Sequence, residues 1–263
     1  MRETGARGDA EALARAADSA EFDAVAAAGG DGTINEVVNG LAASSLPLGV
    51  LPLGTGNVLA NEIALPRDSR DLAAALATAQ AQPIWPGEIV AANGSSRQFV
   101  MMAGVGFDAA VVSRLDERLK RRIGKLAFVL AIVEELVFYR PRRYRVRCDG
   151  TEHEAASLVV AKGHFYGGRF VLAPLARLDE PMLHLVLFKR AGRLAALRYL
   201  AAMALGVAHR LSDVAIVGGK SIVVTAMDDS EPAPVEADGD IVASLPVTIR
   251  VAERPLRLLR PAR

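Results

Sequence analysis

Two periodicities of apolar and polar positions alternate in the first third of the chain. Residues 22–28 and 48–51 are short apolar runs that indicate buried strands. Between them, apolar residues recur at the i, i+3, i+4 and i+7 positions of one helical face, namely Ile34, Val37, Val38 and Leu41. Further helices are predicted over residues 10–20, 58–64 and 71–79. Strands that alternate with helices predict an α/β domain with a parallel sheet.

A glycine-rich turn follows each of the two strands. The turns are Gly29-Gly30-Asp31-Gly32-Thr33 and Gly54-Thr55-Gly56-Asn57. Without a Cβ atom, the backbone can approach a phosphate closely, and the helix that follows directs N–H groups and its dipole toward that phosphate. Because the carboxyl ends of parallel strands share one edge of a sheet, we expect both turns to face one crevice.

Asp31 is the one acid in the first turn. A carboxylate repels bound phosphates unless a cation lies between them, so Asp31 is predicted to act through Mg²⁺. The turn alone leaves an ordinary structural turn equally open. It is not a P-loop, since no Gly-Lys-Ser/Thr follows, and the second turn lacks the third glycine of a dinucleotide site. Thr33 and Glu36 have the spacing of a capping box, which predicts a helix capped by Thr33.

Short strands dominate from residue 88 onward. Asn93-Gly94 is a strong hairpin signal, and Ala237-Asp238-Gly239-Asp240 is a turn between late strands. Residues 82–87 carry two prolines and are predicted to be a linker. We therefore predict an α/β domain over residues 1–86 and a β-rich domain over residues 87–263. Helices are expected over most of 109–139 and over 193–210, and a flexible loop over 163–169.

Composition narrows the class of protein. The chain has 263 residues, of which 51% are hydrophobic, and a net charge of +1, so nothing in its charge favours nucleic acid. One cysteine excludes an internal disulfide and fits a reducing compartment. The first 20 residues are polar and Ala-rich, so no signal peptide is expected. No apolar run approaches the ~20 residues that span a bilayer.

Several motifs occur in a fixed order: GGDGT followed by INE, LPLGTGN, GVGFDA, GGRFVLAPLARLD and EADGD. This ordered set resembles the diacylglycerol kinase catalytic domain family, in particular its bacterial lipid kinases, and sphingosine kinases share the same core. The resemblance implies a phosphofructokinase-like α/β nucleotide domain, a β-sandwich domain, and ATP in the cleft between them. It implies transfer of the γ-phosphate of Mg·ATP to the hydroxyl of a diacylglycerol-like or sphingoid-like lipid. Such an enzyme would be cytoplasmic, in peripheral contact with the inner membrane surface, and could form a homodimer.

The resemblance also assigns roles to residues. Gly29, Gly30, Asp31, Gly32 and Thr33 would hold the ATP phosphates, and Gly54, Thr55, Gly56 and Asn57 would line the same pocket. Asp238 would be the general base or organise the catalytic metal, and Asp108 would lie by the lipid head group. Asp31, Asp179 and Asp240 would serve metal ions, Asp179 in a second, structural site. The alternatives are a helix N-cap at Asp108, a surface acid at Asp179 and a solvated turn at Asp238 and Asp240.

The sequence departs from the family pattern in four places. The usual first strand and its Asn-Pro–Gly loop do not precede residue 22, so we expect a bare edge in the first sheet. Val58 stands where the family often has Asp after GTGN. Asp240 replaces the Glu of the common Asp-Gly-Glu, and Glu180-Pro181 replaces an Asp-Gly in the structural-metal segment.

Two rival functions stay open. NAD kinases also carry GGDGT, but the Asn-Glu pair that they have roughly midway along the chain is not found at that place here. A catalytically inactive lipid- or nucleotide-binding module is the other rival, because the first strand is absent. The basic stretches 118–125 and 140–147 are either solvated faces or attracted to anionic lipid head groups. Apolar residues on helix 193–210 favour core packing over membrane insertion.

Overall fold

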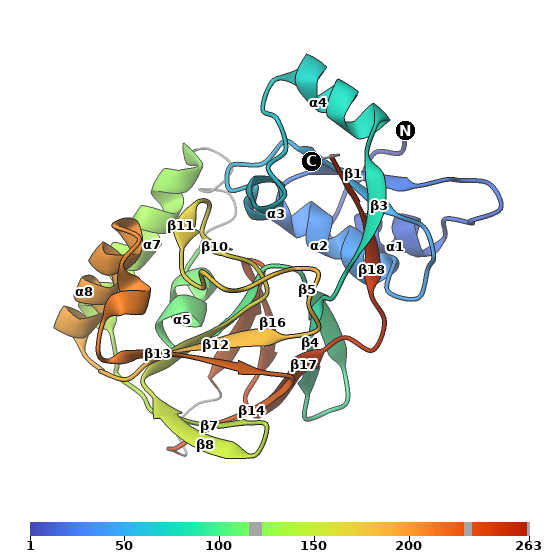
Figure 1. Cartoon of the computed structure of the whole chain (residues 1–263). Coiled ribbons are helices and arrows are strands. Elements are labelled where there is room, and N and C mark those ends of the chain that lie inside the picture. Colours follow the sequence, from blue (N-terminus) through green and yellow to red (C-terminus); the bar gives the residue numbers. More distant parts are fainter. Residues whose placement is uncertain (116–122, 229–232, 262–263) are drawn as a thin grey trace.

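The computed structural model describes residues 1–115, 123–228 and 233–261. Its first region is a four-stranded sheet with the strand order β1-β2-β18-β3 (Figure 1). β1 (Val25–Gly29) and β2 (Leu48–Pro52) pair in parallel, and α2 (Asp31–Gly40) connects them. β1 lies at one edge of this sheet, as expected. The helices of this region are α1 (Asp9–Arg15), α3 (Val58–Glu62) and α4 (Ser69–Ala77).

The second region contains two six-stranded sheets, with the orders β13-β12-β9-β6-β15-β16 and β5-β4-β17-β14-β7-β8. Apolar side chains from both sheets form one buried cluster between them, so the two sheets make a sandwich. The strands of the first sheet are β6 (Met102–Val105), β9 (Ser157–Ala161), β12 (Leu183–Phe188), β13 (Val214–Gly219), β15 (Pro234–Ala237) and β16 (Asp240–Ser244). Those of the second are β4 (Gly87–Ala91), β5 (Ser96–Phe99), β7 (Tyr144–Cys148), β8 (Thr151–Ala155), β14 (Ser221–Ala226) and β17 (Val247–Val251).

Three helices lie on the side of the sandwich drawn at the left of Figure 1. They are α5 (Phe107–Ser113), α7 (Lys125–Phe138) and α8 (Arg193–Ala204). α7 packs against both α5 and α8, and α5 packs against β6, β9 and β15. A short hairpin of β10 (Phe165–Tyr166) and β11 (Phe170–Val171) lies near them, and η1 (Ala208–Arg210) follows α8. Among the described residues, no helix is long and apolar enough to cross a membrane.

Three expectations about local structure are wrong. Gly30 rather than Thr33 caps α2, and the Glu36 carboxylate instead accepts hydrogen bonds from the N–H groups of Gly8 and Ala10 at the start of α1. Half of the predicted linker, residues 82–84, belongs to β3 (Gln80–Ile84), which pairs with β18 (Leu256–Arg260). The loop 163–169 contains β10. The expectation that most of 109–139 is helical is confirmed for the described residues, which form α5 and α7, while 116–122 lies outside them.

The last strand completes the first sheet. β18 lies between β2 and β3, parallel to the former and antiparallel to the latter, although some 170 residues separate it from β3 in the sequence. Leu256 and Leu258 of β18 belong to the core cluster that also holds Ile34, Val38 and Leu48. The expected two-part fold is therefore confirmed, with the addition that the end of the chain returns to the first region.

We expect Leu258→Ala to lower the free energy of unfolding by about 2–5 kcal/mol, because Leu258 is fully buried and the truncation leaves a cavity in the first sheet. Urea denaturation measures the change. Arg257→Ala, at the exposed neighbouring position, is the matched control and should stay within about 0.5 kcal/mol of the parent. Equal effects of both substitutions would show that β18 does not pack as described.

Candidate functional site

The two glycine turns touch one another at the carboxyl ends of β1 and β2. The Leu53 N–H donates a hydrogen bond of 2.9 Å to the Gly29 carbonyl oxygen. A Cβ atom on Gly54 would lie 2.5 Å from the Gly30 Cα, so a side chain there would force the turns apart. Both turns therefore lie at one edge of the sheet, as expected. Glycine is required at residue 54 because the two backbones approach so closely.

Asp31 ties the first turn to the second. Its Oδ1 accepts a hydrogen bond of 2.7 Å from the Val58 N–H, and a Cβ on Gly56 would lie 2.6 Å from its Oδ2. The contact uses the backbone of residue 58, so it forms although that position carries valine. Asn57 has a left-handed backbone with φ of 49°, and its side-chain amide closes the turn by bonding both the N–H and the C=O of Gly54.

Asp240 reaches the first turn from the second region. It begins β16, directly after the turn at Asp238-Gly239, and its Oδ2 lies 3.8 Å from where a Cβ on Gly32 would be. Its Oδ1 forms an ion pair of 3.1 Å with Arg7, and about a quarter of its side chain is exposed. Two carboxylates, those of Asp31 and Asp240, therefore belong to one cluster around the N-terminus of α2.

Asp238 is placed differently, although it is only two residues away. Its Oδ2 accepts hydrogen bonds from Asn35 Nδ2 at 2.9 Å and from the Val100 N–H at 2.8 Å. Its Oδ1 accepts from the N–H groups of Met101 at 2.9 Å and Met102 at 3.1 Å. The residue is buried, and burial raises its pKa although the four donors oppose the shift. Through Asp238, Asn35 of α2 is therefore connected to the backbone of residues 100–102, which lead from β5 into β6.

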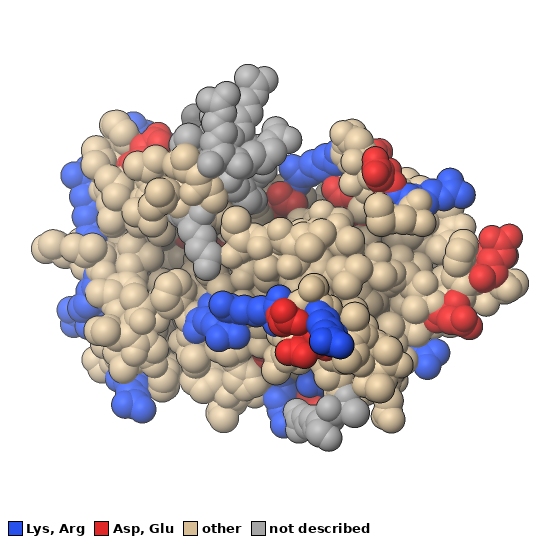
Figure 2. Space-filling model, turned by 90° about the horizontal axis from the view of Figure 1, so that it is seen from above, with Lys and Arg blue, Asp and Glu red and all other residues tan. Residues whose placement is uncertain are grey.

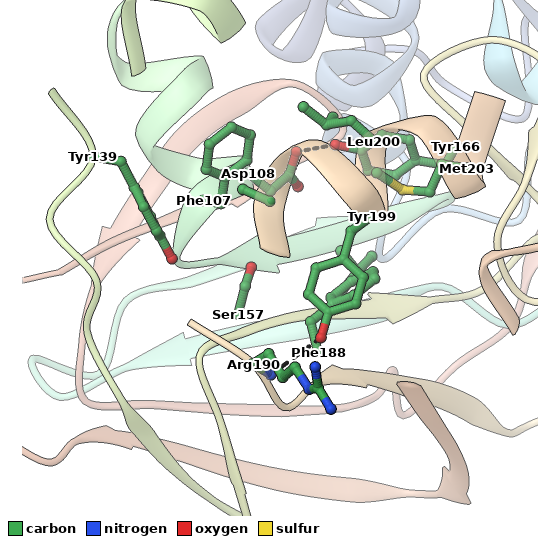
Figure 3. Close-up of a pocket in the computed structure, with 12 residues that line it drawn as sticks. Phe107, Asp108, Tyr139, Ser157, Tyr166, Phe188, Arg190, Tyr199, Leu200 and Met203 are labelled. Carbon is green, nitrogen blue, oxygen red and sulfur yellow. Dashed lines mark hydrogen bonds between the residues drawn. The ribbon is translucent and has the colours of Figure 1, made fainter. Parts of the chain in front are cut away.

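Asp108 lies at the wall of a pocket between the sandwich and the helices (Figure 3). It is the second residue of α5, whose N-cap is Gly106, so the N-cap interpretation of Asp108 is wrong. Its Oδ1 accepts a hydrogen bond from the Tyr166 hydroxyl of β10. The rest of the lining is largely apolar and aromatic: Phe107, Tyr139, Val159, Phe188, Leu200 and Met203. An apolar cavity with one carboxyl group suits a ligand that has a hydrocarbon body and a hydroxyl head.

Glu236 of β15 is a second buried acid beside Asp108, and sequence reasoning missed it. Both carboxyl groups lie over Gly104, where any Cβ would collide with them. The Glu236 Oε2 also accepts a hydrogen bond of 3.0 Å from the Gly239 N–H. Burial raises the pKa of Asp108, and burial together with the adjacent Asp108 carboxylate raises the pKa of Glu236 well above its ordinary value. Glu236 thus joins the pocket to the turn that carries Asp240.

Asp179 lies in another cluster. It pairs with Arg177, whose Nη2 is 2.9 Å from its Oδ2. Lys162, which is fully buried, donates to the carbonyl oxygens of Arg177, Glu180 and Met182 at 3.3, 2.7 and 2.9 Å. Burial lowers the pKa of this ammonium group to about 8. Within the described residues, no group of three or more His, Cys, Asp or Glu is arranged to hold a metal, so a metal at Asp179 stays a prediction.

Two further contacts escaped sequence reasoning. Glu62, at the end of α3, accepts hydrogen bonds from the His164 and Phe165 N–H groups and contacts the His164 ring. Asn61 donates to the carbonyl oxygens of Gly56 and Gly168. These contacts tie the second glycine turn to the loop that carries Tyr166. The motifs around them were visible in the sequence, but their pairing was not.

Comparison with known proteins agrees with this arrangement. The family model for the diacylglycerol kinase catalytic domain matches residues 1–89, and that for the YegS C-terminal NAD kinase beta sandwich-like domain matches residues 101–260. A protein named diacylglycerol kinase from Mycobacterium tuberculosis is 32% identical over 257 residues, which cover 96% of this chain and 82% of the relative. Its namesake from Bacillus subtilis is 36% identical over 244 residues, 91% of this chain and 78% of the relative.

The fold agrees as well. A crystal structure of a diacylglycerol kinase from Bacillus anthracis superimposes with a TM-score of 0.77, at 22% identity, over 98% of this chain and 84% of that one. Together the fold, the paired glycine turns and the relatives define a lipid kinase. The chain belongs to the diacylglycerol kinase catalytic domain family, which confirms the resemblance seen in its motifs. Kinase membership implies ATP as the co-substrate.

We expect Glu236→Gln to raise the melting temperature at about pH 8 by about 2–4 °C, the shift that accompanies roughly 1 kcal/mol. The folded pKa values of the pair are raised, so its contribution to stability is present at acid pH and is lost as the pH rises through those values. The amide can accept from the Gly239 N–H and donate to Asp108 without ionising.

At about pH 4, where the wild-type pair is protonated, the melting temperatures of variant and parent should converge. Glu152→Gln, at an exposed position on β8, is the control and should match the parent at both pH values. A melting-temperature difference for Glu236→Gln that does not change with pH would contradict the account of the buried pair.

Proposed function

We propose that the chain transfers the γ-phosphate of Mg·ATP to the hydroxyl of a diacylglycerol-like or sphingoid-like lipid. The observation that carries this proposal is the meeting of two touching glycine turns with Asp240 from the second region. The pocket that holds Asp108 adjoins the same cluster through Glu236 and the Gly239 N–H. A phosphate donor and a lipid acceptor can thus be held on either side of one turn.

The N-terminus of α2 and the glycine turns supply what phosphates need. Free N–H groups and the helix dipole favour negative charge there, and no Cβ atom blocks the approach. Asp31 offers carboxylate oxygens, the ligand type that Mg²⁺ prefers, and would hold the ion. When bound, Mg²⁺ would neutralise phosphate charge during transfer.

The lipid hydroxyl must lose its proton as the phosphate is transferred. Asp238 was predicted to accept that proton, but four hydrogen bonds already occupy its two oxygens. Its geometry supports a positioning role, in which it fixes the turn and aims the next acid. Asp240 ends the same turn, is partly exposed and faces Gly32. We therefore infer that Asp240 is the better placed acceptor of the proton, with Asp31 left to the metal.

The pocket favours the hypothesis of a lipid kinase over that of an NAD kinase. Its walls are aromatic and aliphatic, and Asp108 with Tyr166 can orient one hydroxyl head group. The proposal extends to an enzyme in the cytoplasm that works at the inner membrane surface, where its acceptor resides. A homodimer and an inactive binding module both stay predictions for experiment.

Phosphate transfer from γ-labelled ATP to lipids in mixed micelles tests the proposal. The panel holds diacylglycerol, monoacylglycerol, a sphingoid base and ceramide, with Mg²⁺ and with EDTA, and NAD in a parallel tube. We expect label in an organic-phase product that depends on Mg²⁺. Label in NADP alone would identify the rival kinase, and no label in any product, with or without ATP binding by calorimetry, would favour the inactive module.

Two asparagine substitutions separate the roles of the two acids in the turn. Asp240→Asn should lower kcat by about 10²–10⁴-fold with little change in melting temperature, because it removes a partly exposed carboxylate. Asp238→Asn should lower the free energy of unfolding by about 3 kcal/mol, because its amide N–H₂ would face backbone N–H donors. Steady-state kinetics and urea denaturation measure both. Normal turnover of Asp240→Asn would remove Asp240 from the chemistry.

A further inference from the structure

Helix α7 exposes its larger apolar side chains to solvent, whereas a surface helix ordinarily turns them toward the core. Its outward side chains Leu126, Val129, Leu130 and Val133 are between 52% and 62% exposed. Its inward positions are smaller or charged: Ala127, Ala131 and Glu135 are buried, and Glu135 pairs with Arg114. A helix that packs only against protein buries its aliphatic stripe, so this arrangement indicates that something else covers the outer side of α7.

The neighbouring helix α8 repeats the arrangement. Leu194 and Leu197 point outward and are largely exposed, whereas Ala196 and Tyr199 are buried. We call six of the outward residues of the two helices the apolar face: Leu126, Val129, Leu130 and Val133 of α7, with Leu194 and Leu197 of α8. α7 and α8 pack against each other and lie side by side in Figure 1.

This apolar face borders the pocket that holds Asp108. Leu200 and Met203 of α8 line the pocket from the inner side of the same helix, and Tyr139, directly after α7, lines it as well. Figure 3 shows these side chains around Asp108 and Tyr166. A lipid whose hydroxyl binds at Asp108 also needs an apolar environment for its hydrocarbon chains. The two helices that carry the outward leucines and valines lie next to that pocket.

The charges around the face point to an anionic partner. α8 contains Arg193 and Arg198 and no acidic residue, and Arg190 precedes it with 71% of its side chain exposed. Asp213 pairs with Arg190 and Arg198, which leaves an excess of positive charge at this end. On the outer side of α7, Glu134 is paired with Arg114. In Figure 2 the left side, where α7 and α8 lie, is mainly uncharged, with several basic side chains and an acidic group at its edge.

We propose that the apolar face docks on an anionic lipid bilayer and so places the pocket at the membrane surface. Half-exposed leucine and valine side chains would enter the boundary between head groups and acyl chains, and the arginines would contact anionic head groups. The acceptor lipid could then reach Asp108 without crossing water. The inference rests on the proposed lipid acceptor and deepens it, since it names the surface from which that acceptor is taken.

Sedimentation with vesicles tests the docking independently of catalysis. The vesicles are phosphatidylcholine, with and without phosphatidylglycerol. The test variant is the double substitution Leu130→Glu and Leu197→Glu, one residue from each helix. The control is Phe22→Glu, an equally exposed apolar residue before β1 in the first region. Both variants alter exposed side chains, so both should keep the melting temperature of the parent.

We expect the parent and Phe22→Glu to sediment with phosphatidylglycerol vesicles, and the double variant to bind at least about 10-fold more weakly. Parent-like vesicle binding by the double variant would overturn the proposal. The proposal would also be overturned if light scattering showed that the parent is a dimer, that the double variant is a monomer, and that both bind vesicles equally. The apolar face would then contact a second copy of the chain.

Activity assays separate this inference from the proposed function. On diacylglycerol in vesicles, the double variant should lose turnover in proportion to its lost binding. On a short-chain diacylglycerol below its critical micelle concentration, it should match the parent. Equal turnover of parent and double variant on vesicles would contradict the docking. If the parent phosphorylates neither substrate, the proposed function fails, while sedimentation still decides the docking.

Discussion

The structure depends on one buried carboxylate. Asp238 sits where the two parts of the chain meet, and a carboxylate in such a place is costly unless hydrogen bonds compensate for the lost water. Three consecutive backbone N–H groups and the Asn35 amide supply that compensation. Because the donors come from both sides of the junction, the four bonds are satisfied together only at one mutual position of α2 and the sandwich. The position of the turn at Asp238-Gly239 is fixed by the same four hydrogen bonds.

The residues on either side of Asp238 use that fixed point. Glu236 precedes it on β15 and reaches Asp108, while Asp240 follows it on β16 and reaches the first glycine turn. Five residues of one hairpin therefore touch both the pocket and the paired turns. Phosphoryl transfer depends chiefly on positioning, so a short connection between the proposed donor and acceptor sites would be a direct way to secure it. The return of β18 to the first sheet adds a second covalent tie between the two parts.

Local pattern predicted the features that local physics sets. The glycine turns, the helix after β1 and the turn at Asp238-Gly239 follow from nearby residues alone. β3 and β18 could not be predicted, because QAQPI and LRLLR become strands only by pairing with each other across the whole chain. Family resemblance located the acids of EADGD, but not which of them turns inward. That depends on the left-handed backbone at Asp238, with φ of 48°, and on donors 136 or more residues away.

For helices α7 and α8, the sequence could predict the helices but not which of their sides faces the solvent. An apolar helix in a sequence is ordinarily assigned to the core, and that assignment assumes that the protein supplies the covering layer. Here the sandwich covers only the side of small residues, and Glu135 takes an inward position because Arg114 neutralises it. The aliphatic side is left outward beside a pocket whose own walls are apolar. A lipid kinase that docks on a bilayer needs an exposed apolar surface of this kind. The hydrophobic effect that elsewhere buries side chains in a protein core would then bury them in the membrane.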